Sequence, residues 1–232
     1  MKDIILYHSS KAGLIGNIKP ISRPNCDFGQ GFYLGTDELQ TQSLVLSNKF
    51  ENPVCYRVLL KISEIDENRI LKLNGLDWVF FVLYNRNHLE ELKGTTFYEK
   101  YAHLADNKDI IIGPIADDNM RNAILDFEED YITDEVLKKC LSTVDYGLQY
   151  VLKTPLSCSK VDILESNFIK KDSNLPALIN YAEIHRQQGV EDYKQIKRSA
   201  IRTGRYLFEI IEEEKQKTCQ QILEPVEKDE YE

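Results

Sequence analysis

Apolar positions along the chain follow two spacings, one typical of strands and one typical of helices. Short apolar or alternating runs predict strands, and apolar residues that recur every three or four positions predict helices. The predicted strands span residues 4–8, 32–34, 54–62, 66–73, 109–114, 148–153 and 160–164. The predicted helices span residues 37–50, 76–84, 118–129, 134–144, 175–188 and 190–214. Strands mixed with helices, followed by helices alone, predict an α+β fold.

Capping and breaking residues indicate where these elements begin and end. Thr36 and Asp37 are suited to accept from the free N–H groups of a helix start, and Pro53 ends that segment. Residues 15–31 are rich in Gly, Pro, Asn and Asp and predict a long loop, a type of segment that is often functional. We expect a domain of residues 1–170, followed by a helical appendage of residues 171–232 with a frayed end.

Charge is spread unevenly and argues against a broad nucleic-acid surface. The net charge is −9, and residues 212–232 hold eight acidic residues against three lysines, which places −5 of it in the tail. Non-specific nucleic-acid binding depends on clustered Lys and Arg, which the body does not show broadly. One local basic cluster is either a solvated helix face or a surface for nucleic acid or an anionic substrate; it consists of Lys194, Lys197, Arg198, Arg202 and Arg205.

Composition places the chain among cytoplasmic globular proteins without a structural metal. Its 232 residues are 42% hydrophobic, enough for a sizeable core, and no apolar run approaches the roughly 20 residues that cross a bilayer. The N-terminus lacks the pattern of a cleaved signal peptide. Five cysteines are scattered without metal-ligand spacing, which favours reduced thiols and no metal site.

Three segments carry residues that are candidates for binding or catalysis. His8 ends the first strand, where it is either a hydrogen-bonded structural histidine or a functional one. Gly29 and Gly31 allow a close approach of the backbone to a ligand, or simply form a turn. Gln149 lies on an alternating strand, where it is either functional or a solvent-facing polar residue.

Taken together, these segments resemble the motifs of ADP-ribosyltransferases of the diphtheria-toxin and poly(ADP-ribose) polymerase type. Residues 6–10, Leu-Tyr-His-Ser-Ser, resemble the first motif, in which a strand carries His followed by Gly. Residues 31–36, Gly-Phe-Tyr-Leu-Gly-Thr, resemble the second, and Gln149 falls where the third carries a catalytic glutamate. The likeness extends over residues 4 to about 165.

The likeness is stronger to an uncharacterised bacterial family within this superfamily. Its members combine a Tyr-His-Gly-Ser start, Arg-Pro-x-x-Asp-Phe-Gly-x-Gly-Phe-Tyr, a Trp with a later Asn-Arg, and Asp-Ile-x-x-Gly-Pro-x-Ala-x-Asp. This chain carries the corresponding residues in the same order, namely Arg23-Pro24, Asp27–Tyr33, Trp78, Asn85-Arg86 and Asp109–Asp118. The resemblance implies split antiparallel β-sheets with flanking helices, and NAD as the donor of ADP-ribose.

The resemblance also implies roles for particular residues. His8 would donate to a ribose hydroxyl, the backbone at Ser9 would bind the nicotinamide carboxamide, and Tyr33 would stack on the nicotinamide ring. Arg23 would pair with the pyrophosphate. The loop that would wrap the ribose contains Asp27, Phe28, Gly29 and Gly31.

Two departures from the motifs affect the expected chemistry. Ser9 replaces the usual Gly, which is tolerable where only backbone groups are used. Gln149 replaces the glutamate; an amide can orient a ribose but cannot act as a base. Asp117 or Asp118 would supply a carboxylate or only cap a helix, and Arg86 would contact a phosphate or only cap carbonyl groups.

These implications favour an enzyme that transfers ADP-ribose from NAD to a macromolecule, either protein or nucleic acid. Such a compact domain would suit a bacterial toxin or phage-defence effector that a cognate antitoxin or inhibitor protein keeps silent. Two alternatives stay open. In the first, the chain is a catalytically impaired module that binds NAD or ADP-ribose. In the second, it is a scaffold that recruits a partner through its C-terminal helices.

Overall fold

The computed structural model describes residues 1–45, 53–115, 121–142, 147–169, 171–199 and 203–223. Its strands are β1 (Ile4–Ser10), β2 (Phe32–Gly35), β3 (Val54–Leu60), β4 (Ile70–Lys72), β5 (Ile110–Pro114), β6 (Leu148–Leu152) and β7 (Val161–Phe168). Its α-helices are α1 (Glu38–Ser43), α2 (Gly75–Asn85), α3 (Thr96–His103), α4 (Arg121–Glu128), α5 (Asp134–Leu141), α6 (Pro155–Cys158), α7 (Lys171–Ser199) and α8 (Leu207–Leu223). Short 3₁₀ turns lie at Ile62–Glu64, Glu67–Arg69 and Glu90–Leu92.

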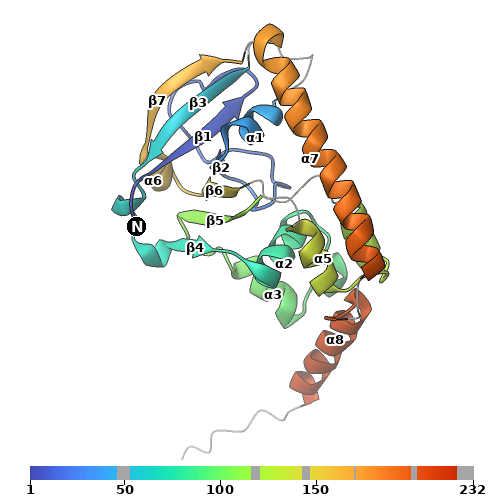
Figure 1. Ribbon diagram of the computed structural model, residues 1–232. Coiled ribbons are helices and arrows are strands. Elements are labelled where there is room, and N and C mark those ends of the chain that lie inside the picture. The colour runs from blue at the N-terminus through green and yellow to red at the C-terminus, as the bar shows by residue number, and fades with distance from the viewer. Residues whose placement is uncertain (46–52, 116–120, 143–146, 170, 200–202, 224–232) are drawn as a thin grey trace, which may run out of the picture.

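The seven strands form one mixed sheet with helices packed around it, which confirms the predicted α+β class (Figure 1). The strand order is β4-β5-β6-β2-β1-β3-β7. Only β4 and β5 run parallel; the other neighbours are antiparallel. The resemblance implied split antiparallel sheets, whereas hydrogen bonds join these seven strands into one sheet.

Strand β2 is covered on both of its faces by separate apolar clusters. Successive side chains of a strand point to opposite faces. Phe32 and Leu34 therefore lie in one cluster with Leu6 and Val58, whereas Tyr33 packs against the other, which contains Val151. The second cluster is larger and also takes in residues of α2, α4, α5 and α8. This division decides which candidate side chains share a face.

Helix α7 runs along one side of the molecule and contacts α1 and α5 (Figure 1). The turn after it is held by two hydrogen bonds between Arg205 and Asp134, the first residue of α5. Arg205 N–H donates to Asp134 Oδ1 and Asp134 N–H donates to the Arg205 carbonyl, each at 2.9 Å. On α8, Glu214 accepts from the Thr96 hydroxyl at 2.9 Å, and Ile210 is fully buried. The last two helices thus pack onto the body, and the boundary at residue 170 stays a prediction.

The predicted pair of helices at 175–188 and 190–214 is wrong. Helix α7 continues through Gly189, and the break comes later, at residues 203–206. Gly189 is buried, so packing offsets the roughly 1 kcal/mol that a helical glycine costs. Gly204 has φ +86°, a left-handed conformation that ends a helix far more readily.

Other elements differ from prediction in length. The strand predicted at 66–73 is shortened to β4, because Asp66 accepts from Asn68 N–H and caps a 3₁₀ turn instead. Helix α3 was not predicted, and β7 extends four residues further than expected. The helix predicted to reach residue 50 ends at Ser43; residues 46–52 lie outside the described residues. Asp37 caps that helix as predicted, accepting from Gln40 N–H at 2.9 Å.

Within the described residues, no helix combines the length and apolar composition needed to span a bilayer.

Candidate functional site

The three predicted motifs lie on three neighbouring strands. Strand β2 lies between β1 and β6 in the sheet. Tyr7 of β1 is opposite Gly35 of β2, and Gly35 is in turn opposite Gln149 of β6. Residues 28 positions apart (Tyr7 and Gly35) and 114 positions apart (Gly35 and Gln149) are therefore brought to one part of the sheet.

Beyond that rung, strands β1 and β2 separate. Tyr7 and Gly35 are their one registered pair, whereas Ser9 and Ser10 pair with β3 on the other side. The His8 imidazole bridges the two strands, because its Nδ1 lies 2.8 Å from the Tyr33 carbonyl oxygen. A carbonyl only accepts hydrogen bonds, so Nδ1 carries the proton. The side chain of His8 thus holds the strands where the ladder ends.

The His8 ring is half-buried and favours its neutral form. Its centroid lies 4.3 Å from that of Phe32 and 6.3 Å from that of Tyr56. Burial lowers the pKa of His8 below 6.5, although the bond to the Tyr33 carbonyl opposes the shift. In the neutral ring with Nδ1 protonated, Nε2 is an acceptor. Among the described residues Nε2 has no hydrogen-bond partner.

The rings of His8 and Tyr33 lie on opposite faces of the sheet. Phe32 and Tyr33 are consecutive on β2 and point to opposite faces, and His8 packs on Phe32. Gln149 shares the face of Tyr33, because Tyr33 is opposite Val151 and Gln149 lies two residues before it. The structure therefore brings Tyr33 and Gln149 to one face, and His8 reaches Tyr33 only through its backbone carbonyl.

Tyr33 fastens the loop that precedes its own strand. Its hydroxyl donates to the Gly29 carbonyl at 2.6 Å and accepts from Phe28 N–H at 3.1 Å. Burial raises the pKa of Tyr33, so the hydroxyl stays protonated and donates. The hydroxyl is thus used within the protein.

Asp27, Arg86 and Gln149 form a cluster on this face, which we call the Asp27 cluster. Arg86 Nε and Nη2 donate to Asp27 Oδ1 at 2.9 and 2.6 Å. Gln149 Nε2 donates to Asp27 Oδ2 at 3.3 Å and to the Pro114 carbonyl at 3.0 Å. Gln149 is only 6% exposed, so the alternative of a solvent-facing polar residue is wrong. Arg86 forms an ion pair with Asp27, and the contact to a phosphate or to helix carbonyl groups stays a prediction.

Packing explains why the Phe28–Gly31 loop carries a phenylalanine and two glycines. Phe28 is fully buried, with its ring centroid 5.9 Å from that of Phe81, so its side chain belongs to the core and only its backbone can face a ligand. Gly29 has φ +69°, and a Cβ atom there would lie 2.6 Å from Asn85 Oδ1. A Cβ atom on Gly31 would lie 2.5 Å from Val151 Cγ1. Both glycines are required by the fold itself.

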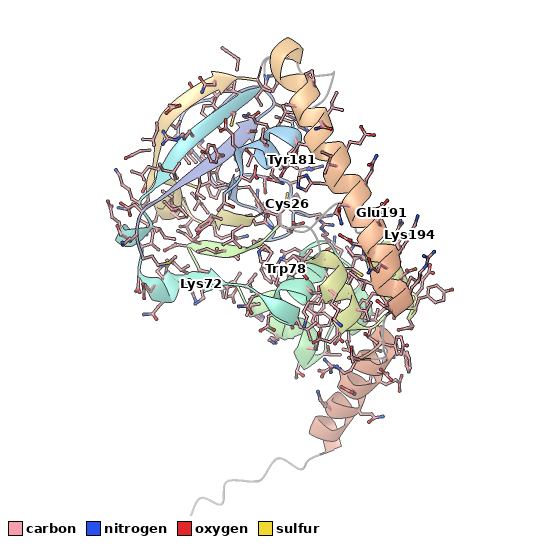
Figure 2. All side chains as sticks on the ribbon, viewed as in Figure 1. Cys26, Lys72, Trp78, Tyr181, Glu191 and Lys194 are labelled. Carbon is pink, nitrogen blue, oxygen red and sulfur yellow. The ribbon has the colours of Figure 1, made fainter. Side chains whose placement is uncertain are left out.

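Lys153 is a charged residue of this region that the sequence analysis missed. Its Nζ donates to the Phe28 carbonyl at 2.8 Å, and burial lowers its pKa to about 8 despite the opposing influence of Cys26. A lysine directly after the apolar β6 strand was the available signal. Figure 2 shows Cys26, in the same loop, between the sheet and α7, and Trp78 on α2. Trp78 Nε1 donates to the Pro114 carbonyl at 3.0 Å.

The remaining candidates are less closely tied together. Ser9 Oγ lies 3.4 Å from Thr41 Oγ1 at the start of the gap between β1 and β2. Arg23 is exposed on the loop. Asp117 and Asp118 lie outside the described residues. No group of three or more His, Cys, Asp or Glu side chains in the described part of the chain is arranged to hold a metal ion.

Comparison with known proteins gives a family match. No curated protein and no solved structure matches the chain. A family model with the description "Protein of unknown function (DUF3990)" matches residues 4–163, the segment that contains β1, β2, β6 and the Asp27 cluster. The chain therefore belongs to the DUF3990 family.

Proposed function

We propose that this protein is an ADP-ribosyltransferase that transfers ADP-ribose from NAD to a macromolecular acceptor. The observation that carries the proposal is the adjacency of β1, β2 and β6, with His8 bonded to Tyr33 and Gln149 in register with Gly35. The resemblance to ADP-ribosyltransferases rests on these same three motifs. Sequence likeness and spatial adjacency are separate observations, and together they favour this reaction.

The separation of β1 and β2 is the place where we expect NAD to bind. Beyond Tyr7 the β1 backbone has no registered partner on β2, so main-chain groups near Ser9 are suited to a carboxamide. Neutral His8 offers Nε2 as an acceptor for a ribose hydroxyl, the reverse of the donor role that the sequence predicted. The exposed guanidinium of Arg23 suits the pyrophosphate.

Cleavage of the nicotinamide–ribose bond requires little covalent chemistry from the protein. The transition state has oxocarbenium character, so rate comes from holding the donor in a reactive geometry and excluding water. Tyr33, with its hydroxyl fixed on Gly29, presents a ring of set orientation for stacking. We place the protein in the cytoplasm, where a toxin or phage-defence effector would meet NAD, its acceptor and an inhibitor protein.

A transfer assay tests the proposal directly. Purified protein is incubated with NAD labelled in its adenylate phosphate and a bacterial lysate. We expect label on protein or nucleic acid, with loss of at least about tenfold in His8→Ala and Tyr33→Ala. His103→Ala and Tyr131→Ala are matched controls, since both side chains are exposed and far from β1 and β2 in sequence. Circular dichroism of each variant verifies folding.

The assay also separates the alternatives. Saturable NAD binding without transfer would identify a binding module. The amide of Gln149 would account for this outcome, because it can orient a ribose but cannot act as a base. Absence of NAD binding would refute both the enzyme and the module and leave a scaffold. Gln149→Glu should retain NAD binding; abolished binding would contradict the placement of Gln149 at the site.

A further inference from the structure

A carboxylate stands beside the amide that occupies the third motif. Asp27 Oδ2 lies 3.3 Å from Gln149 Nε2, although the two residues are 122 positions apart. We infer that Asp27 supplies the catalytic carboxylate that Gln149 lacks; this inference rests on the proposed function. It assigns the acid–base role to the loop before β2 in place of strand β6.

The Asp27 carboxylate has acceptor capacity left for a substrate. Two carboxylate oxygens offer about four acceptor positions. The described residues fill three of them, two from Arg86 on Oδ1 and one from Gln149 on Oδ2. The Asp27 side chain is 13% exposed, so it is neither sealed in the core nor free in solvent. The open position is on Oδ2, the oxygen next to Gln149.

The neighbours of Gln149 favour an amide once Asp27 is in place. Gln149 Nε2 satisfies the Pro114 carbonyl as well as Asp27, and a carboxylate has no N–H for either. Glutamate there would also bring two carboxylates together, which strongly raises the pKa of one of them. The site thus carries one carboxylate, placed on the loop.

The loop holds Asp27 firmly enough for catalysis. The adjacent residue, Phe28, is fully buried, its N–H donates to the Tyr33 hydroxyl, and Lys153 donates to its carbonyl. Arg86 fixes the carboxylate itself with two charge-assisted bonds. A catalytic group held by packing and by its neighbours' hydrogen bonds keeps a productive geometry.

The proposed reaction is a displacement of nicotinamide at ribose C1′. The bond between ribose C1′ and the nicotinamide nitrogen breaks, and its electron pair leaves with neutral nicotinamide. An oxygen or nitrogen of the acceptor forms the new bond to C1′. The acceptor's proton passes to the Asp27 carboxylate and then to solvent. In the transition state, the negative charge of Asp27 stabilises the positive charge that develops on the ribose.

The first test compares steady-state NAD consumption by the full chain and its variants. We expect Asp27→Asn to lower kcat about 100-fold or more, as loss of a general base does, with NAD affinity within about threefold of wild type. The double variant Asp27→Asn with Gln149→Glu returns a carboxylate to the cluster and should recover at least about tenfold over Asp27→Asn. Asp162→Asn is the matched control, because Asp162 is an exposed aspartate paired with Lys61, the residue that follows β3.

A second measurement does not depend on the folding of Asp27→Asn. In Gln149→Glu the paired carboxylates share a proton, so the acidic limb of the kcat–pH profile should move to higher pH. An unmoved limb overturns the inference, as does Asp27→Asn with wild-type kcat. In those cases wild type still consumes NAD and the proposed function stands. Wild-type protein that consumes no NAD overturns both.

Discussion

The candidate residues on the two faces of strand β2 differ in how many hydrogen bonds they make within the protein. On the Tyr33 face, the Tyr33 hydroxyl makes two hydrogen bonds, the Gln149 amide two and the Asp27 carboxylate three. On the Phe32 face, His8 makes one bond through Nδ1. The comparison teaches that Tyr33 and Gln149 spend their polar groups on the protein itself, whereas Asp27 keeps one acceptor position on Oδ2 and His8 keeps Nε2.

The largest effect should come from the anchor of the Tyr33 face. Phe28→Ala removes a fully buried ring from the larger core cluster, which should lower the free energy of unfolding by about 3–5 kcal/mol. Urea denaturation measures this. Phe208→Ala is the matched control, because that ring is half exposed and should cost less than about 1 kcal/mol. Equal losses in the two variants would show that the loop is not anchored through Phe28.

The next effect concerns the ion pair of the Asp27 cluster. Arg86→Met leaves Asp27 without its cation on a largely buried carboxylate, which should cost about 2 kcal/mol of stability. Arg57→Met breaks the exposed pair with Glu165 and should cost less than about 1 kcal/mol. Thermal unfolding of both variants at low and high salt is the measurement. If the stability lost in Arg86→Met depends more strongly on salt than the stability lost in Arg57→Met, the pair of Arg86 and Asp27 is not buried.

The sequence could predict the strands of the site but only part of its contacts. Strands β1, β2 and β6 have local apolar patterns, so their positions were predicted to within two residues. The placement of Phe32 and Tyr33 on opposite faces also follows from strand alternation. The pairing of Asp27 with Gln149 does not, because it joins positions 122 apart through the loop's tertiary packing. A single sequence gives no signal for such a pair.

The C-terminal helices show the same limit. Apolar spacing predicted helices after residue 174, but Gly189 misplaced the break between them. The actual turn depends on Asp134, whose carboxylate accepts from Arg205 N–H some 71 residues away. Local pattern therefore predicts an element's type well, whereas its ends are set by partners remote in sequence.

A smaller effect should follow from removing one hydroxyl on the Tyr33 face. Tyr33→Phe leaves the Gly29 carbonyl and Phe28 N–H without their partner, at a cost of about 1–2 kcal/mol. Hydrogen exchange at the amide of Phe28 should quicken, while Tyr131→Phe, at an exposed ring, should leave it unchanged. Unaltered exchange at Phe28 would mean that the Tyr33 hydroxyl does not hold the loop.

The smallest expected effect on stability comes from His8, which lies on the Phe32 face of strand β2. Because burial lowers its folded-state pKa below 6.5, the unfolded chain takes up a proton first as the pH falls. The stability that depends on neutral His8 is therefore present above pH 6.5 and is lost as the pH falls through the lower folded-state pKa. NMR titration should find His8 below 6.5 and His103, whose pKa is raised by its bond to Asp106, above it. ¹⁵N shifts should show the neutral His8 ring protonated at Nδ1. A neutral ring protonated at Nε2 would leave Nδ1 as an acceptor against the Tyr33 carbonyl, and Nε2 could then not accept a hydrogen bond from a ribose hydroxyl.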